Sequence, residues 1–222
     1  MKNLRIPSVL MIAFAGLSLV VTACKKDGCT DPLASNYNNN ANHDDGSCEY
    51  DGTTPGTSTE VVDDITSPTT WSAATVTVCG DIEVSAALTI NPGVTVIMCA
   101  GASIDVDPSG SITAVGNAVN PIAIKGEVAS AGYWEGMRIQ SNNPNNRLEF
   151  VTISDAGSYW GWDFANLYIS GSARLAIKNS TLSNSQEVGL YAEDGTTIAE
   201  FANNTFSSNA TVGLLSLIHI SE

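Results

Sequence analysis

The feature that most constrains this chain is a series of short apolar bursts, each ended by Gly, Pro or Asp. The segment 91–116, NPGVTVIMCAGASIDVDPSGSITAVG, shows the pattern. Apolar and polar residues alternate within each burst, which predicts half-buried β-strands, and no burst is long enough for a helix. The triplets with this alternation are Ile82–Val84, Leu88–Ile90, Val94–Val96, Ile104–Val106, Ile122–Ile124, Leu167–Ile169 and Leu175–Ile177.

The bursts also recur at a longer period. Ile82 recurs as Ile104, 22 residues later, and Leu175 lies 24 residues beyond Val151. A period of this length with several short strands per repeat predicts a parallel β-solenoid, in which coils stack at about 4.8 Å around an apolar interior. The corners of such coils need residues that accept positive φ. The glycines expected at these corners are Gly93, Gly101 and Gly110.

The first 23 residues have the features of an export signal. Two basic residues precede the apolar run Ile6–Val21, which is too short to span a bilayer comfortably. The run ends in VTAC, which resembles the bacterial lipobox, in which the cysteine becomes the acylated N-terminus. We therefore expect a lipid on Cys24, and an ordinary secretory signal followed by an incidental cysteine is the alternative.

The charge of the exported chain limits its partners. The whole chain has a formal net charge of −14, and without the signal seven basic residues remain against 23 acidic ones, a net charge of −16. Such an acidic chain is not expected to bind nucleic acid or anionic lipid through a basic patch. The excess of carboxylates suits an exported protein that uses divalent cations.

The remaining four cysteines form two local pairs in the sequence. Cys29 and Cys48 bracket a small polar segment, and Cys79 and Cys99 lie 20 residues apart in the strand-rich part. In an oxidising compartment we expect two disulfides, although the sequence leaves other pairings open. On a solenoid, Cys79 and Cys99 are expected to meet on adjacent coils.

The segment 25–50, KKDGCTDPLASNYNNNANHDDGSCEY, resembles a Cys-bracketed repeat of exported proteins from Bacteroidetes-type bacteria that is compared with thrombospondin type 3 calcium repeats. A disulfide around such a loop contributes about 3 kcal/mol in the chain-entropy model. Its side chains offer oxygen ligands of the kind that Ca²⁺ accepts, although the EF-hand spacing is absent. A spacer rich in Asx turns is the alternative. The candidate calcium ligands are Asp31, Asn36, Asn38, Asn40, Asp44 and Asp45.

The last eight residues, LSLIHISE, equal the translation of a common sequencing-library adapter in one reading frame. We therefore expect a fragment whose solenoid is truncated at its C-terminal end, and a natural short strand is the alternative. The predicted organisation is a signal peptide (1–23), a disulfide-closed module (24–50), a Gly/Thr/Pro linker (51–64), a β-helix (65–214) and adapter read-through (215–222).

Three segments carry a family resemblance: LTINPGVTVIMCAGASIDVDPSGSITAVGNAVNPIAIKG, YWEGMRIQ and NSTLSNSQEVGLYAEDGTTIAEFANNTFSSN. Together they resemble the right-handed parallel β-helix of the pectin lyase-like superfamily, over roughly Trp71–Gly213. The stretches at Asn179 and Asn204 resemble the Asn-bearing turns that stack in such helices. An immunoglobulin-like sandwich also has short strands and turns and is the main alternative.

Enzymes of this superfamily cleave uronate or glycan chains. The hydrolases use clustered Asp residues with Gly-His-Gly and Arg-Ile-Lys motifs, and neither motif occurs here. Asp155, Asp163 and Asp194 are expected to lie far apart. The lyases use calcium-binding carboxylates with an Arg or Lys base, and the basic residues here are expected to be solvated, without an acidic cluster. These basic residues are Lys125, Arg138, Arg147, Arg174 and Lys178. We expect no catalytic residue in this chain.

Aromatic residues give a better functional signal. The stretch YWGW interrupts the strand pattern in a predicted loop, and exposed Trp and Tyr stack on sugar rings while neighbouring polar groups bond the hydroxyls. Core packing is the alternative for these residues, and for Trp134 packing is what the family resemblance implies. The candidate carbohydrate-binding residues are Tyr159, Trp160, Trp162 and Asp163.

The sequence thus predicts a cell-envelope lipoprotein that is lipid-anchored to the outer membrane. Lys25–Asp27, directly after Cys24, resembles the charged signals that send such lipoproteins to the outer face, so surface exposure is expected. The β-helix is expected to be a non-enzymatic module that binds a polysaccharide or a host or cell-surface glycan, or acts in adhesion. A polysaccharide lyase or hydrolase whose catalytic coils follow the truncation is the alternative, and a structural stalk is a third interpretation.

Overall fold

The computed structural model describes residues 25–30, 36, 38–43, 45, 47, 59–61, 63–158 and 164–216. The chain divides into two units, Met1–Asp51 and Gly52–Glu222. In the first unit, Cys29 is buried and disulfide-bonded, and an isolated parallel bridge joins Asp27 to His43. None of the described residues forms a helix long and apolar enough to cross a membrane.

The second unit contains three parallel β-sheets. The first sheet consists of β1 (Thr59–Val61), β3 (Thr75–Val78), β6 (Thr95–Met98), β9 (Ile122–Gly126), β12 (Val151–Ser154), β15 (Thr181–Ser183) and β18 (Thr205–Ser207). The second consists of β4 (Asp81–Val84), β7 (Ser103–Val106), β10 (Gly136–Ile139), β13 (Ala165–Ile169), β16 (Val188–Ala192) and β19 (Val212–Ser216). The third consists of β2 (Thr69–Trp71), β5 (Ala87–Ile90), β8 (Ser111–Val115), β11 (Arg147–Glu149), β14 (Arg174–Lys178) and β17 (Thr197–Ala202).

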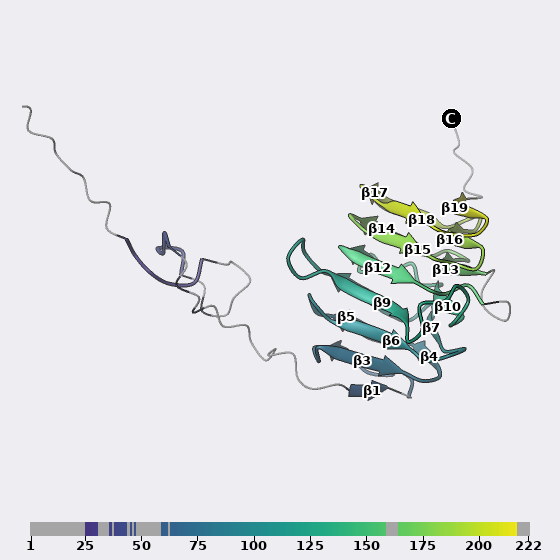
Figure 1. Ribbon diagram of the computed structural model, residues 1–222, viewed down its shortest axis with the longest axis horizontal. Helices are drawn as coiled ribbons and strands as arrows, with labels where there is room; N and C mark the ends of the chain where they lie inside the picture. The colour runs from purple at the N-terminus through teal and green to yellow at the C-terminus, as the bar shows by residue number, and fades with distance from the viewer. Residues whose placement is uncertain are drawn as a thin grey trace, which may run out of the picture. The chain divides into compact units, whose positions relative to one another are not determined.

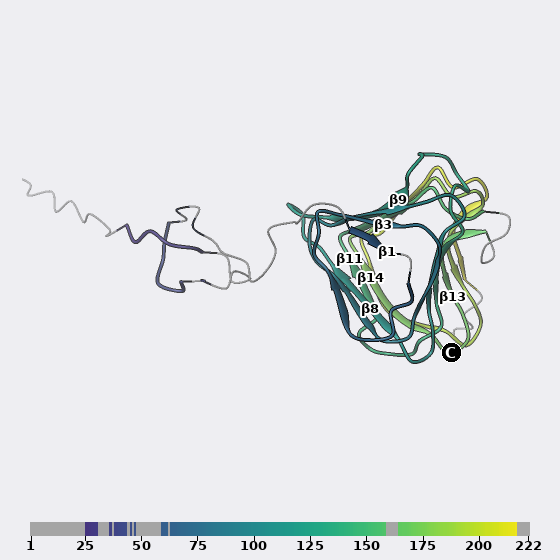
Figure 2. The ribbon, with the colours of Figure 1, turned by 90° about the horizontal axis from the view of Figure 1, so that it is seen from below.

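The chain visits the first, second and third sheets in turn and then repeats the circuit one coil further on (Figure 1). Figure 2 looks along the stack and shows three walls around one interior. Because every strand pairs in parallel with the equivalent strand of the next coil, the unit is a parallel β-solenoid. The predicted all-β fold is confirmed.

The two apolar residues of each strand triplet point inward, and they are buried in the solenoid interior. Ile82, Ile104 and Met137, for example, stack in register on the second sheet and are each at most 1% exposed. Full burial of such a side chain contributes about 2 kcal/mol. The interior is therefore a continuous apolar column along the stack.

The predicted periods were right in one part of the chain and wrong in another. Ile82 and Ile104 are in register, as expected. Val151 instead pairs with Ile122 in the first sheet, whereas Leu175 lies in β14 of the third sheet. The 24-residue spacing between Val151 and Leu175 resembles the length of one coil, but it does not pair these residues, because the corners between strands vary in length.

The corner glycines serve two purposes. Gly93 and Gly101 adopt φ of 81° and 70°, as the sequence predicted. Gly110 has no such φ, but a Cβ there would overlap the carbonyl group of Val84 on the preceding coil. At Gly110 the requirement is thus close backbone approach, not positive φ.

The corner from the third sheet to the first is short, and asparagines stack there. Asn179 and Asn203 adopt φ of 50° and 55°, and Asn203 Nδ2 donates to Asn179 Oδ1 at 3.0 Å. The predicted stacking partner, Asn204, instead accepts from the Ser180 N–H at 3.1 Å and donates to the Ile177 carbonyl at 3.0 Å. The asparagine stack is thus one residue earlier than predicted.

At the C-terminal end, β19 pairs with β16 in register and includes Leu215 and Ser216. These two residues were assigned to adapter read-through from the sequence. Residues 217–222 lie outside the described residues. The adapter assignment and the predicted domain boundaries stay predictions.

Candidate functional site

The corner from the first sheet to the second carries the longest connections of the solenoid. Residues 127–135 join β9 to β10, and residues 155–164 join β12 to β13 on the next coil. The second connection contains the predicted carbohydrate-binding residues, which lie outside the described residues. These residues are Tyr159, Trp160, Trp162 and Asp163. The described parts of this corner and of the second sheet form the candidate site.

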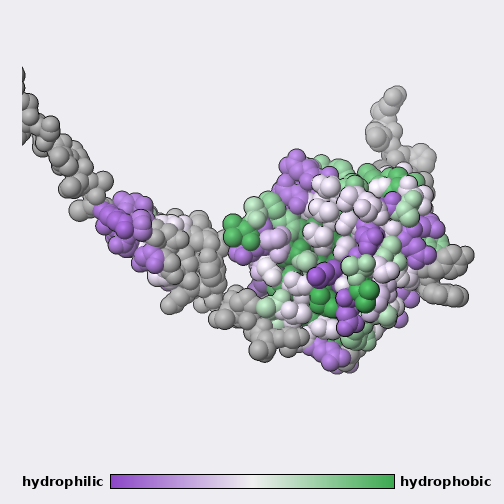
Figure 3. Space-filling model, viewed as in Figure 1, coloured by the Kyte–Doolittle hydropathy of each residue, from purple (hydrophilic) through white to green (hydrophobic). Residues whose placement is uncertain are grey.

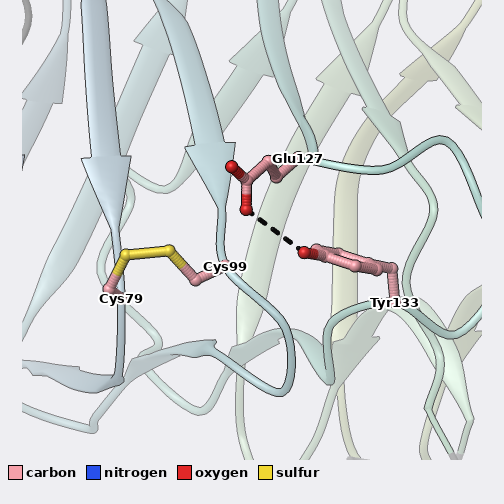
Figure 4. The surroundings of a disulfide bond; sticks show 4 residues. All are labelled: Cys79, Cys99, Glu127 and Tyr133. Carbon is pink, nitrogen blue, oxygen red and sulfur yellow. Dashed lines mark hydrogen bonds between the residues drawn. A yellow bond between two sulfur atoms is a disulfide. The ribbon is translucent and has the colours of Figure 1, made fainter.

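The 127–135 connection is held by backbone hydrogen bonds to both neighbouring coils. The Gly101 N–H donates to the Tyr133 carbonyl at 3.0 Å, and the Tyr133 N–H donates to the Asp155 carbonyl at 2.8 Å. The Tyr133 hydroxyl donates to Glu127 Oε2 at 3.2 Å (Figure 4). Partial burial, together with this hydrogen bond and the charge of Glu127, raises the pKa of Tyr133. The connection is therefore an ordered part of the corner.

Trp134 is fully buried, and its Nε1–H donates to the Ser154 carbonyl at 2.7 Å. The indole thus belongs to the apolar core, and its polar group has a hydrogen-bond partner. Its predicted role as a packing residue is confirmed. Trp134 is not available to a ligand.

Two tyrosines on the outer face of the second sheet were not predicted from the sequence as candidate site residues. Tyr168 and Tyr191 occupy equivalent outward positions on β13 and β16, and their rings stack with centroids 5.3 Å apart. Tyr168, Ala165 and Val188 form a buried apolar cluster separate from the solenoid interior, with Tyr191 and Val212 packed against it. The signal in the sequence was Tyr in the middle of two successive triplets, LYI and LYA.

The same outward column is charged in the earlier coils. Arg138 lies beside Asp105 in register, and its guanidinium contacts both carboxylate oxygens, with Nε–Oδ1 at 2.9 Å. The next residue in the column is Glu83. A hydrogen bond with Asp107, followed by partial burial and nearby carboxylates, raises the pKa of Glu83. Arg138 was expected to be solvated, and that expectation was wrong because the coil register places Asp105 opposite it.

The outer face of the third sheet has an ion-pair network across three coils. Arg147 contacts Glu149 at 3.2 Å and Glu200 at 3.4 Å, and Lys178 contacts the same two carboxylates at 3.6 and 3.1 Å. The hydrogen bond from Lys178, with the charges of Arg147 and Lys178, lowers the pKa of Glu200. The prediction that Arg147 and Lys178 lack acidic neighbours was therefore wrong.

The other two basic residues of the solenoid, Lys125 and Arg174, are exposed as predicted. Asp155 is 5% exposed, accepting from the Ser154 hydroxyl and from Asn184 Nδ2, both at 2.8 Å. Asp155 thus has a structural role at its corner. Asp163 lies outside the described residues.

The predicted calcium ligands that the structure describes make hydrogen bonds within their own segment. Asn36 Nδ2 donates to the Ser47 carbonyl at 2.5 Å, and Asn38 Oδ1 accepts from the Asn40 N–H at 3.1 Å. Asp45 Oδ1 accepts from the Ser47 N–H at 2.9 Å, and hydrogen bonds with Ser47 lower the pKa of Asp45.

Among the described residues, no group of three or more His, Cys, Asp or Glu is placed to hold a metal ion. Asp31 and Asp44 lie outside the described residues, so the calcium site stays a prediction. Cys24 and Cys48 lie outside them as well, and with them the lipid attachment and the pairing of Cys29.

The predicted disulfide between Cys79 and Cys99 is present, with Cα atoms 4.8 Å apart (Figure 4). Val78 and Met98, the residues just before them, are in register on β3 and β6. The disulfide therefore joins adjacent coils, as expected from the solenoid. It lies at the same corner as the 127–135 connection.

The comparisons with known proteins agree with this geometry. The family model described as right handed beta helix region matches residues 82–217, more than half of the chain. Neither the curated proteins nor the solved structures gave a match. On the strength of the family match and the three parallel sheets, the chain belongs to the right-handed β-helix family.

Proposed function

We propose that this protein is a lipoprotein of the bacterial outer membrane whose β-helix, of the pectin lyase-like kind, binds a glycan without cleaving it. In this proposal Cys24 carries the lipid and holds the protein at the cell surface. The thrombospondin-like module, with Ca²⁺ as its ligand, separates the anchor from the β-helix. The bound partner is a polysaccharide or a host or cell-surface glycan.

The observation that carries the glycan proposal is a stacked aromatic pair on the outer face of the second sheet. The connection that contains YWGW leads into β13, and the stacked pair of Tyr168 and Tyr191 lies on the outer face of β13 and β16. Aromatic side chains give sugars an apolar surface and a polar edge. The rigid coils beneath would hold that surface in one shape.

The contacts of the charged groups support binding without cleavage. Arg138, Arg147 and Lys178 are basic residues of the solenoid that are each engaged in an ion pair. A base for proton abstraction must be free to reach the substrate. Their engagement favours a structural role for these three residues.

The glycan proposal is tested by screening the purified chain against an array of polysaccharides. We expect binding to at least one glycan class. Because a few central aromatic residues carry most of the energy of an interface, Trp160→Ala with Trp162→Ala should weaken it by about tenfold or more. Phe201→Ala, on the third sheet and 46% exposed, is the matched control and should bind like the parent.

Two results would contradict the glycan proposal. One is equal binding by the tryptophan variant and the parent, or no binding to any glycan of the array. The other is the release of unsaturated sugars from a polyuronate, which would favour the lyase alternative. The anchor is tested separately, because Cys24→Ser should abolish incorporation of labelled palmitate.

A further inference from the structure

The outer face of the first sheet carries two columns of hydroxyl side chains. Strand pairing aligns Thr75, Thr95, Ala123, Thr152, Thr181 and Thr205 in one column. It aligns Thr77, Ile97, Lys125, Ser154, Ser183 and Ser207 in the other. Over the last three strands every outward position is Thr or Ser. We call this surface the hydroxyl face, consisting of Thr152, Ser154, Thr181, Ser183, Thr205 and Ser207.

Most hydroxyls of this face make no hydrogen bond within the described part of the chain. Ser154 donates to Asp155 Oδ2, but the side chains of the other five residues make no hydrogen bond to any described residue. Elsewhere in the solenoid, hydroxyls hydrogen-bond to the backbone. Ser141 donates to the Gly110 carbonyl at 2.6 Å, and Thr196 donates to the Glu193 carbonyl at 2.7 Å. The five hydroxyls are therefore available to bond something outside the chain.

The hydroxyl face is also a regular grid. Its three strands pair without a register shift, so equivalent side chains repeat at the strand spacing of about 4.8 Å. Within a strand the two outward side chains are two residues apart, about 6.7 Å. Each Thr adds a methyl group beside its hydroxyl. These two repeats are close to the oxygen repeats on the prism plane of hexagonal ice.

The face is uncharged on an acidic solenoid. The described residues between 59 and 216 include 15 acidic and five basic ones, yet none of them is on the hydroxyl face. The charged outward residues of the first sheet, Glu60 and Lys125, belong to earlier coils. In Figure 3, which looks onto this sheet, the atoms over its upper strands are mostly pale, the colour of intermediate hydropathy. A neutral face complements a neutral, periodic partner.

From these observations we propose that the hydroxyl face binds ice. The regularly spaced hydroxyls and threonine methyls would order a layer of water that continues into the crystal lattice. A glycan fits this face less well, because sugar sites combine aromatic surfaces with convergent polar groups and the hydroxyl face has no aromatic residue. The proposal is independent of the glycan proposal, since it concerns a different sheet.

The test is inhibition of ice recrystallisation by the purified exported chain in annealed frozen solutions. The parent should slow the growth of ice grains. Thr181→Tyr, at the centre of the face, keeps a good strand former but breaks the grid. Because central contacts dominate an interface, it should raise the concentration needed for inhibition by about tenfold. The matched control is Thr89→Tyr, on the outer face of the third sheet, which should leave inhibition unchanged.

Circular dichroism and thermal unfolding keep the test interpretable, because both variants must retain the parent's strand signal. Three outcomes would overturn the proposal. They are no inhibition by the parent beyond that of an unrelated protein, equal loss in the Thr181 and Thr89 variants, and loss of polysaccharide binding in the Thr181 variant alone. The last result would assign the hydroxyl face to a glycan.

Discussion

Single residues at the corners decide how closely the coils of this solenoid approach. Asn179 and Asn203 accept left-handed backbone, as Asn does more readily than most residues. Gly110 lies so close to the Val84 carbonyl that any side chain would overlap it, whereas a Cβ at Gly80 would have nothing within 4 Å. The corners thus differ in their tolerance of a side chain, although both glycines look alike in the sequence.

The first prediction compares these two glycines. Gly110→Ala should lower the free energy of unfolding by about 1–3 kcal/mol, because the added methyl forces the backbone of adjacent coils apart. Gly80→Ala, the matched control, should change it little. Urea unfolding followed by circular dichroism measures both. Equal stability of the two variants would show that the coils do not approach at Gly110 as described.

A second prediction concerns Glu83, whose pKa is raised by its hydrogen bond with Asp107, by partial burial and by neighbouring carboxylates. A raised pKa in the folded state means that the protonated form stabilises the fold below the unfolded pKa. This stabilisation is lost as the pH rises through the folded pKa. Glu83→Gln should therefore raise the melting temperature near neutral pH and leave it unchanged in acid. A gain of equal size at both pH values would contradict this.

The individual strands were predictable from the sequence, but their pairing was only partly so. Alternation identified β4 and β5, because each buries every second residue. The partner of a strand depends on the corner lengths, which range from one residue at Phe150 to ten at 155–164. A period count cannot follow such variation. The Tyr168–Tyr191 stack and the ion pairs were missed for this reason, since each joins residues brought together only by register.

The third prediction tests the ion-pair network on the third sheet. Lys178→Met should lower the free energy of unfolding by about 0.5–1 kcal/mol, because Glu149 and Glu200 lose a cation while the methylene packing is kept. Arg174→Met, on the same strand but exposed, is the control and should be nearly neutral. The difference should shrink at high salt. A salt-independent difference would assign the loss to packing.

At the scale of the whole molecule, stacked coils account for both the stability and the surfaces of the protein. The interior is one apolar column, and each outer face is a set of ladders with its own chemistry: hydroxyls on the first sheet, tyrosines on the second, ion pairs on the third. The solenoid was predictable because its repeat is visible in the sequence. The chemistry of each outer face was not predictable, because the strand register decides which outward residues of successive coils lie in one column.

The fourth prediction concerns the disulfide between Cys79 and Cys99, which joins two coils. Replacing both residues with Ser should lower the free energy of unfolding by about 3 kcal/mol, the value expected for closing a loop of this length. Urea unfolding of the parent and the double variant measures the difference. Under reducing conditions the two should become equally stable. A difference that persists after reduction would mean that the serines act through packing.

The measurement that tests the central claim most directly is amide hydrogen exchange of the chain with and without a glycan that it binds. We expect added protection at the corner of 127–135 and 155–164 and in β13, the side that carries the aromatic residues, with the glycan recovered intact. Protection confined to the third sheet, or glycan recovered as fragments, would contradict a binding site at this corner that does not cleave its ligand.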